Sequence, residues 1–169
     1  QQELLAQHCF DANVRVLIAR LANVYGAGQD LSKPQGLITR LSLAAIRRTP
    51  VTMYVPLDTM RDYIAAHDAS VRLLHWIAHL DSTNSTRVIA SGQATSLGYL
   101  IKLTKDVTKV RLPIAYGLDS SAAAQARDLR LLPDDDVYTT SLPLTSLPEG
   151  INNVYEDTRA RSRLSHIVS

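Results

Sequence analysis

The stretch Arg20-Leu-Ala-Asn-Val-Tyr-Gly-Ala-Gly-Gln29 decides how this chain of 169 residues is interpreted. It continues residues 14–19, an aliphatic and β-branched run that predicts a buried strand. Residues 23–35, which are rich in Gly, Asp, Ser and Pro, then predict a loop at the carboxyl end of that strand. Ligands bind at such ends in α/β proteins, so Asn23 is a candidate binding residue; an ordinary turn is the alternative.

Outward from this stretch, apolar spacing predicts helices that alternate with strands. Helices are predicted over residues 1–10, 37–48 and 69–78, from Thr95 or Ser96 to Val107, and from Ser146 to about Arg159. Strands are predicted over residues 14–19, 51–55, 87–90 and 112–115, whereas residues 120–132 fit either a helix or a strand. This alternation indicates an α/β or mixed α+β fold with a small sheet, in a single domain over residues 1–169.

A second stretch, Arg61-Asp-Tyr-Ile-Ala-Ala-His-Asp68, also places polar side chains where a plain core would not need them. The planar guanidinium of Arg61 suits a phosphate because it donates two hydrogen bonds at once. The alternative for Arg61 is a salt bridge to a nearby carboxylate such as Asp58. Asp68 is predicted as the N-cap of a helix whose apolar face carries Val71, Leu74, Ile77 and Ala78.

Composition and charge narrow the class of protein. Apolar residues make up 46% of the chain and charged residues 20%, as in an ordinary globular protein. The net charge of +2 is too small to indicate nucleic-acid binding, and no apolar run is long enough to cross a bilayer. We therefore expect a cytoplasmic protein with no nucleic-acid or membrane partner. The lone Cys9 excludes an internal disulfide.

Other groups of polar residues give weaker signals. His75 and His79 stand at i and i+4, a spacing that can bind zinc, but no third ligand is evident and no metal site is predicted. The run Asp134-Asp-Asp136 after Pro133 is interpreted as a solvated turn. We predict no catalytic residue, because the chain contains neither a Gly-x-Gly-x-x-Gly loop nor a Tyr-x-x-x-Lys pair.

Taken together, the two stretches resemble the extended short-chain dehydrogenase/reductase family of NAD-dependent nucleotide-sugar epimerases and dehydratases. The resemblance spans roughly residues 3–157 and includes Val-Ile-Ala-Ser-Gly92 and Leu-Pro-Glu-Gly-Ile151 in the same order. It implies the later, C-terminal part of a Rossmann-type sheet with a small substrate-binding α/β subdomain. The N-terminal dinucleotide-binding half is not part of that resemblance.

The resemblance also implies roles for individual residues. Asn23 and Arg61 would hold the diphosphate of a nucleotide sugar, with Arg127 or Arg130 as weaker candidates. The implied substrate-binding residues are Asn23, Arg61, Gly36, Leu37 and Tyr54, and the implied cofactor-binding residues are Leu21, Ala22 and Asn23. The cofactor is NAD or NADP in the full-length protein, with none bound tightly and no turnover by this chain alone. The implied partners are a nucleotide sugar, the missing N-terminal half and a second copy in a homo-oligomer.

One departure from the family pattern keeps two alternatives open. Family members often carry Gly-x-Gly before the arginine that matches Arg61, where this chain has Val55-Pro56-Leu57. The chain then fits either a family reductase that acts on a small carbonyl compound or a non-catalytic binding module that reuses the fold.

Overall fold

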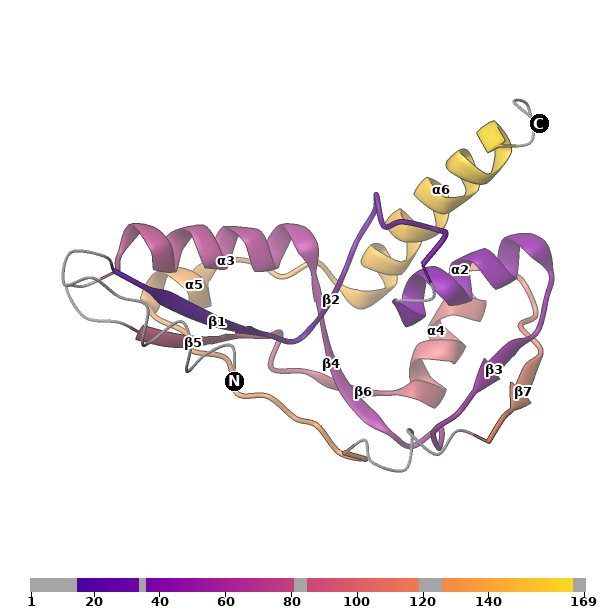
Figure 1. Ribbon diagram of the computed structural model, residues 1–169, viewed down its shortest axis with the longest axis horizontal. Helices are drawn as coiled ribbons and strands as arrows, with labels where there is room; N and C mark the ends of the chain where they lie inside the picture. The colour runs from indigo at the N-terminus through magenta and orange to yellow at the C-terminus, as the bar shows by residue number, and fades with distance from the viewer. Residues whose placement is uncertain (1–14, 34–35, 81–84, 119–125, 166–169) are drawn as a thin grey trace.

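The computed structural model describes residues 15–33, 36–80, 85–118 and 126–165, which form a mixed α/β structure with two lobes (Figure 1). The helix predicted over residues 1–10 and Cys9 lie outside the described residues. The elements follow in the order β1 (Leu17–Leu21), β2 (Asn23–Tyr25), α2 (Leu37–Arg47), β3 (Val51–Met53), β4 (Met60–Ala65), α3 (Ala66–Ala78), β5 (Ser85–Ile89), β6 (Ala94–Ser96), α4 (Leu97–Thr108), β7 (Ile114–Tyr116), α5 (Val137–Ser141) and α6 (Leu147–Ser165).

The two lobes are joined by a mixed sheet of order β2-β4-β6. The smaller lobe contains β1 and β5, which pair in parallel, together with α3 and α5. The larger lobe contains α2, α4, α6 and the parallel pair β3 and β7. The chain passes from one lobe towards the other at Ala22, whose N–H donates to the Ile89 carbonyl at 2.9 Å. The predicted α/β class with parallel strands is confirmed.

Hydrogen-bonded pairing between strands places the strand ends at other residues than the apolar pattern predicts. The strand predicted over residues 14–19 runs instead over Leu17–Leu21, in register with Ser85–Ile89. The predicted loop 23–35 begins with a strand, β2, because Asn23–Tyr25 pair with Tyr63–Ala65 of β4. The ends of the other predicted strands shift by at most two residues for the same reason: 51–55 becomes Val51–Met53, 87–90 becomes Ser85–Ile89, and 112–115 becomes Ile114–Tyr116.

The helices of the larger lobe follow the sequence pattern closely. α2 begins at Leu37 as predicted and ends at Arg47, one residue before the predicted end. The Ser96 hydroxyl caps α4 by accepting a hydrogen bond from the N–H of Tyr99 at 3.2 Å. α6 continues past Arg159 to Ser165. Apolar faces of α2, α4 and α6 meet in the main core, which includes Ile38, Leu41, Leu100, Ile101, Ile151 and Val154.

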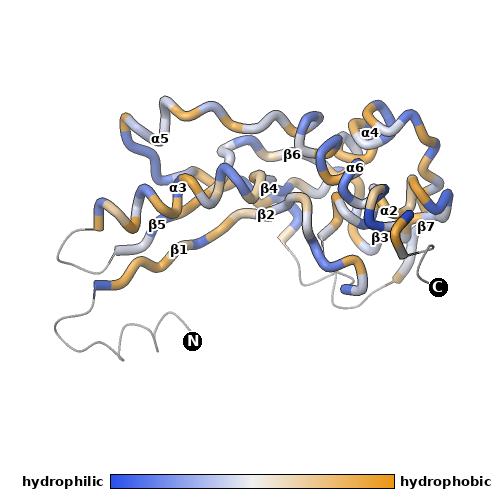
Figure 2. The backbone as a smooth tube through the Cα atoms, turned by 90° about the horizontal axis from the view of Figure 1, so that it is seen from above, coloured by the Kyte–Doolittle hydropathy of each residue, from blue (hydrophilic) through white to orange (hydrophobic). Residues whose placement is uncertain are grey.

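The prediction for α3 is wrong in two respects. Its N-cap is Ala65 rather than Asp68, because β4 runs directly into the helix. Leu74 and Ile77, predicted to face the core, are 65% and 51% exposed, whereas α3 buries Asp68, Ala69 and Arg72. Figure 2 shows hydrophilic and hydrophobic residues alternating along α3. The buried face of α3 therefore depends on polar partners that lie far along the chain.

Asp134, Asp135 and Asp136, which we call the aspartate clasp, supply those partners. Asp134 and Asp135 are exposed as predicted, but the three residues form no turn. Asp134 pairs with the edge of β5: its N–H donates to the Val88 carbonyl at 3.0 Å and its carboxylate accepts the Val88 N–H at 2.6 Å. Asp135 forms an ion pair with Arg72, whose side chain is 6% exposed. The clasp thus ties the chain before α5 to both β5 and α3.

The third clasp residue also starts α5, which the sequence did not predict. The Asp136 carboxylate accepts the Thr139 N–H at 2.8 Å as part of a capping box, and it contacts Nε2 of His75 at 2.6 Å. The ring of His75 stacks on Tyr138 with centroids 4.6 Å apart.

Of the ambiguous segment 120–132, the described residues 126–132 form no helix and make a single bridge, from Asp128 to Met60. In the part of the chain that the structure describes, no helix has the length and apolar character needed to span a membrane.

Candidate functional site

A hollow of about 440 Å³, which we call the central pocket, lies where β2 and β4 meet the beginning of α2. It brings together four residues that the sequence predicted, Asn23, Gly36, Leu37 and Arg61. Sequence reasoning missed other lining residues, among them Gln29, Ile38, Val55, Thr59, Tyr63 and Leu97. The hollow is of the size that binds small molecules in proteins.

One wall of the central pocket is formed by β4 and the residue before it. Thr59, Arg61 and Tyr63 all line the pocket because alternate residues of a strand point to the same face. Arg61 donates to the Met60 carbonyl at 2.8 Å. Thr59 is 1% exposed, and its hydroxyl is buried with no hydrogen-bond partner among the described residues. Alternation from Arg61 is the sequence signal that identifies Thr59 and Tyr63.

Asn23 is held on β2, not on a loop as predicted. It lies opposite Tyr63 in the β2–β4 ladder, and its Nδ2 donates to the Asp62 carbonyl at 2.9 Å. Asp62 points to the other face of β4, where it is fully buried and its carboxylate accepts the Ser91 N–H at 2.9 Å. These bonds fix the Asn23 side chain at the pocket edge.

The beginning of α2 forms the facing wall. Its N-cap, Gly36, has φ 81° and provides no side-chain cap for the N–H groups of the first turn. A Cβ at Gly36 would lie 2.2 Å from the Gln29 side chain, so a glycine is needed for the turn as well as for the close contact. The Gln29 amide is held there by the Thr39 hydroxyl, at 2.5 Å. An uncapped helix N-terminus attracts anions.

The loop between β2 and α2 is anchored by α6. The N–H of Gly28 donates to the Asp157 carboxylate at 3.0 Å, and Arg161 donates to the Gln29 carbonyl at 2.6 Å. Arg161 also pairs with Asp157 at 2.9 Å, one helical turn away. Because Arg161 lies beyond the predicted end of the last helix, the longer α6 is what positions this loop.

Two tyrosines of the central pocket stay neutral at physiological pH. Burial raises the pKa of Tyr63 to about 12. Burial also raises the pKa of Tyr25 to about 12, and the nearby charges of Asp68 and Glu149 act in the same direction. Both phenols therefore donate hydrogen bonds as neutral groups and neither acts as a base near neutral pH.

The remaining predicted residues lie outside the pocket lining. Leu21 ends β1 with 51% of its surface exposed, and Ala22 follows it at the carboxyl edge of the β1–β5 pair. Tyr54 is 46% exposed and its ring covers Gly117, where a Cβ would lie 2.6 Å from it. A contact between Tyr54 and the far end of a ligand stays a prediction.

The other candidate polar residues are engaged elsewhere. Asp58, the alternative partner of Arg61, accepts hydrogen bonds from Arg127, from Nε at 3.1 Å and also from Nη2. Arg130 pairs with Asp128 at 3.0 Å. His79 contacts the His75 carbonyl, and no three potential metal ligands cluster within residues 15–33, 36–80, 85–118 and 126–165.

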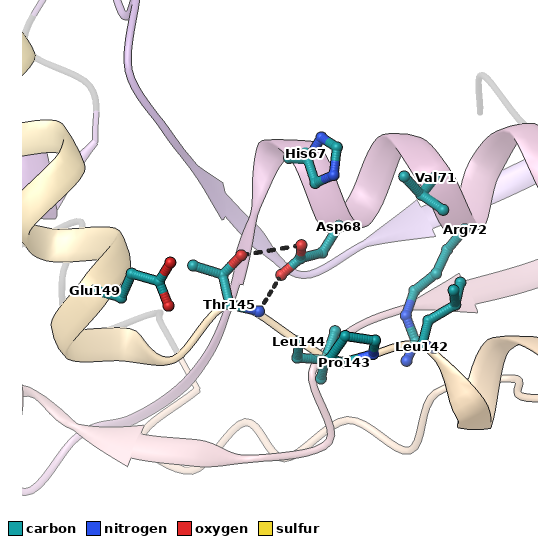
Figure 3. A pocket seen from close by; sticks show the side chains of 9 residues that line it. All are labelled: His67, Asp68, Val71, Arg72, Leu142, Pro143, Leu144, Thr145 and Glu149. Carbon is teal, nitrogen blue, oxygen red and sulfur yellow. Dashed lines mark hydrogen bonds between the residues drawn. The ribbon is translucent and has the colours of Figure 1, made fainter.

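A second hollow, of about 430 Å³, lies between the first turn of α3 and the chain that enters α6 (Figure 3). Asp68 extends across it and accepts hydrogen bonds from the N–H and hydroxyl of Thr145, at 2.8 and 3.0 Å. Arg72 lies at the other end of this hollow and forms the ion pair with Asp135. Because these charged groups are bonded within the protein, the central pocket is the stronger candidate site.

Comparison with known proteins agrees with this fold. A sequence model described as the NAD dependent epimerase/dehydratase family matches residues 1–92, more than half of the chain. The chain therefore belongs to the NAD-dependent epimerase/dehydratase family. It is also 29% identical over 98 residues to a dTDP-L-rhamnose 4-epimerase of Burkholderia thailandensis, covering 57% of this chain and 27% of that protein.

Solved structures of related proteins share the fold. MoeE5 in complex with UDP-glucuronic acid and NAD is 29% identical, with a TM-score of 0.70 over 87% of this chain and 48% of its own. UDP-glucose 4-epimerase of Thermotoga maritima with UDP-glucose is 25% identical, with a TM-score of 0.68 over 88% of this chain and 46% of its own. The chain thus spans about half the length of these solved relatives and about a quarter of the curated one.

Proposed function

We propose that this chain is the substrate-binding, C-terminal portion of an NAD(P)-dependent nucleotide-sugar epimerase or dehydratase, and that the central pocket holds the diphosphate of the sugar nucleotide. One observation carries the proposal: Asn23, Arg61 and the uncapped beginning of α2 line the same hollow. Two relatives of similar fold are in complex with UDP-glucuronic acid and with UDP-glucose, which supports this class of ligand.

The chemistry of the pocket suits a diphosphate. The guanidinium of Arg61 offers a planar pair of donors, and the first turn of α2 contributes N–H groups and the positive end of a helix dipole. The neutral Tyr63 phenol adds a donor that carries no charge of its own. All of these groups favour a negatively charged ligand over a neutral one.

The proposed cofactor is NAD or NADP, bound by the whole enzyme. Leu21 is the last residue of β1, Ala22 follows it, and Asn23 begins β2, so these three residues fit a contact to one end of a dinucleotide. When bound, the cofactor would accept and return a hydride. The glycine-rich loop and the Tyr-x-x-x-Lys pair, which this sequence lacks, would be supplied by the N-terminal half of the same enzyme, so we expect no turnover from this chain alone.

Calorimetric titration with UDP, dTDP and UDP-glucose tests the proposal. We expect Arg61→Gln and Asn23→Ala to weaken binding by about tenfold each, the loss expected for one charge-assisted contact. Arg130→Gln is the matched control, because its guanidinium is exposed and pairs with Asp128 outside the pocket. Unchanged affinity in the Arg61 variant would refute the diphosphate site.

A reductase that acts on a small carbonyl compound is the second candidate, and Val55 favours it. Val55 lines the central pocket at a position where the family often has a glycine, so its side chain occupies space beside the ligand. In that case none of the three nucleotides would bind. A nucleotide that binds while the full-length protein lacks the Tyr-x-x-x-Lys pair would instead identify a binding module without catalytic activity.

A further inference from the structure

A second positively charged hollow lies at the other end of α2. Its volume is about 610 Å³, and it lies between the C-terminal halves of α2 and α6 and the turn after α4. Four guanidinium groups line it, those of Arg47, Arg48, Arg159 and Arg163. We call it the arginine pocket. α2 has 11 residues, so its length of roughly 16 Å separates this hollow from the central pocket at its beginning.

Little negative charge opposes these four arginines. Arg159 makes a loose ion pair with the exposed Glu156, with 3.6 Å between Nη1 and Oε1. The guanidinium groups of Arg47, Arg48 and Arg163 make no hydrogen bond or ion pair with any described residue. The chain as a whole carries a net charge of only +2, so this concentration of positive charge is local. Such a cluster repels itself and is stabilised when an anion binds.

The backbone next to the pocket supports a role for these side chains. Arg48 ends α2 with φ 55° and Lys109 ends α4 with φ 57°, in the left-handed region where glycine is the usual residue. A side chain in that region costs about 1 kcal/mol relative to glycine. Both turns lead into the parallel strands β3 and β7, and the pocket is lined by Arg48 and by Val110, the residue after Lys109.

The rest of the lining indicates what kind of anion fits. Ala45, Ile46 and Val110 give the hollow an apolar floor, and the half-buried Tyr155 adds an aromatic ring beside the arginines. Guanidinium groups bind phosphate oxygens in pairs, and aromatic and aliphatic side chains suit the organic part of a ligand. We propose that the arginine pocket binds an organic polyphosphate, of the size and chemistry of a nucleoside triphosphate, at a site separate from the central pocket.

Calorimetric titration of the full chain with ATP and with inorganic triphosphate tests this proposal. At low ionic strength, on the order of 0.05 M, we expect ATP to bind, and Arg159→Gln/Arg163→Gln to weaken it at least tenfold. The control Lys33→Gln/Lys102→Gln removes the same charge from exposed positions outside the hollow and should change the ATP affinity less than twofold. Tyr155→Leu should weaken ATP binding but leave inorganic triphosphate unchanged.

The outcomes separate this site from the central pocket. Arg61→Gln should leave ATP binding intact, and Arg159→Gln/Arg163→Gln should leave UDP binding intact, provided that both variants keep the circular dichroism of the parent. The proposal is overturned if ATP does not bind, if both double variants weaken it equally, or if Arg61→Gln alone abolishes it. A failure of UDP to bind the central pocket, with ATP binding retained, would refute the proposed function and leave this site standing.

Discussion

The two lobes are held together in different ways. The larger lobe has a continuous apolar core, in which α2, α4 and α6 bury aliphatic side chains against one another. The apolar cluster of the smaller lobe has Ile64, Ala69 and Ile89 as its buried members among the described residues. The smaller lobe therefore depends on the aspartate clasp, which connects β5, α3 and α5 through charged groups.

This difference shows where polar groups serve the fold and where they serve a ligand. In the smaller lobe, Arg72 and His75 are almost fully buried and each has an aspartate partner. In the central pocket, by contrast, Arg61 and the beginning of α2, which has no side-chain cap, line a hollow. A guanidinium and a helix N-terminus beside a hollow are suited to an anionic ligand.

The largest effect is expected when the clasp is broken at Asp135. Asp135→Ala leaves the buried guanidinium of Arg72 without its carboxylate, and the free energy of unfolding should fall by about 3 kcal/mol. Urea unfolding measured by circular dichroism gives this value. In the double variant Asp135→Ala/Arg72→Met no buried charge is left, so it should recover part of the loss. Surface substitutions usually change the free energy of unfolding by less than about 0.5 kcal/mol. If Asp135→Ala changed it by no more than this, the clasp would not be important for stability.

In the larger lobe, Gly36→Ala should cost about 2 kcal/mol and also weaken UDP binding, because its Cβ would collide with the Gln29 side chain beside the pocket. Gly28→Ala is the matched control: it has nearly the same φ, 84°, but no atom lies within 4 Å of the added Cβ. It should cost only about 1 kcal/mol for the backbone conformation and leave UDP affinity unchanged. Equal losses of stability and affinity in the two variants would show that the contact with Gln29 does not shape the pocket.

The same contrast explains what the sequence could predict. α2 and α4 follow from apolar spacing, because the free energy that holds them is the burial of one continuous face. For α3 the apolar pattern was misleading, since its buried residues Asp68 and Arg72 have partners at Thr145 and Asp135, more than sixty positions away. No local pattern contains such pairs.

The candidate site was predictable to the extent that its residues belong to short motifs. Asn23, Gly36, Leu37 and Arg61 converge as expected. Thr59 and Tyr63 were missed because residues 60–65 were not recognised as a strand, so their alternation with Arg61 was not used. Gln29 was missed because its position depends on Arg161 in the unpredicted end of α6.

Acid should weaken the smaller lobe through Asp136. Hydrogen bonds from the Thr139 backbone and from His75 hold the pKa of its carboxyl well below the usual value of about 3.9. The folded state therefore binds this proton less readily than the unfolded state, and the resulting stability is present above about pH 4 and is lost as the pH falls further. In thermal unfolding between about pH 5 and pH 3, Asp136→Asn should show a shallower decline than the parent, since asparagine still caps α5.

Asp106→Asn, on the exposed side of α4, is the control for this pH dependence. The Asp106 carboxylate makes no hydrogen bond or ion pair with the described residues. Its replacement should therefore leave the decline of thermal stability between about pH 5 and pH 3 as it is in the parent. If Asp136→Asn and Asp106→Asn gave the same slope, the acid sensitivity would have to arise elsewhere in the molecule.

The smallest effect is expected at the boundary between the lobes, where Tyr25 and Tyr63 line the central pocket. Their pKa values of about 12 predict that both remain protonated when exposed tyrosines have ionised. At about pH 11, above the usual tyrosine pKa of about 10, Tyr25→Phe/Tyr63→Phe should therefore leave the ultraviolet absorbance of tyrosinate unchanged. A decrease in the double variant would mean that water reaches the two phenols, and that the pocket wall between the lobes is open in solution.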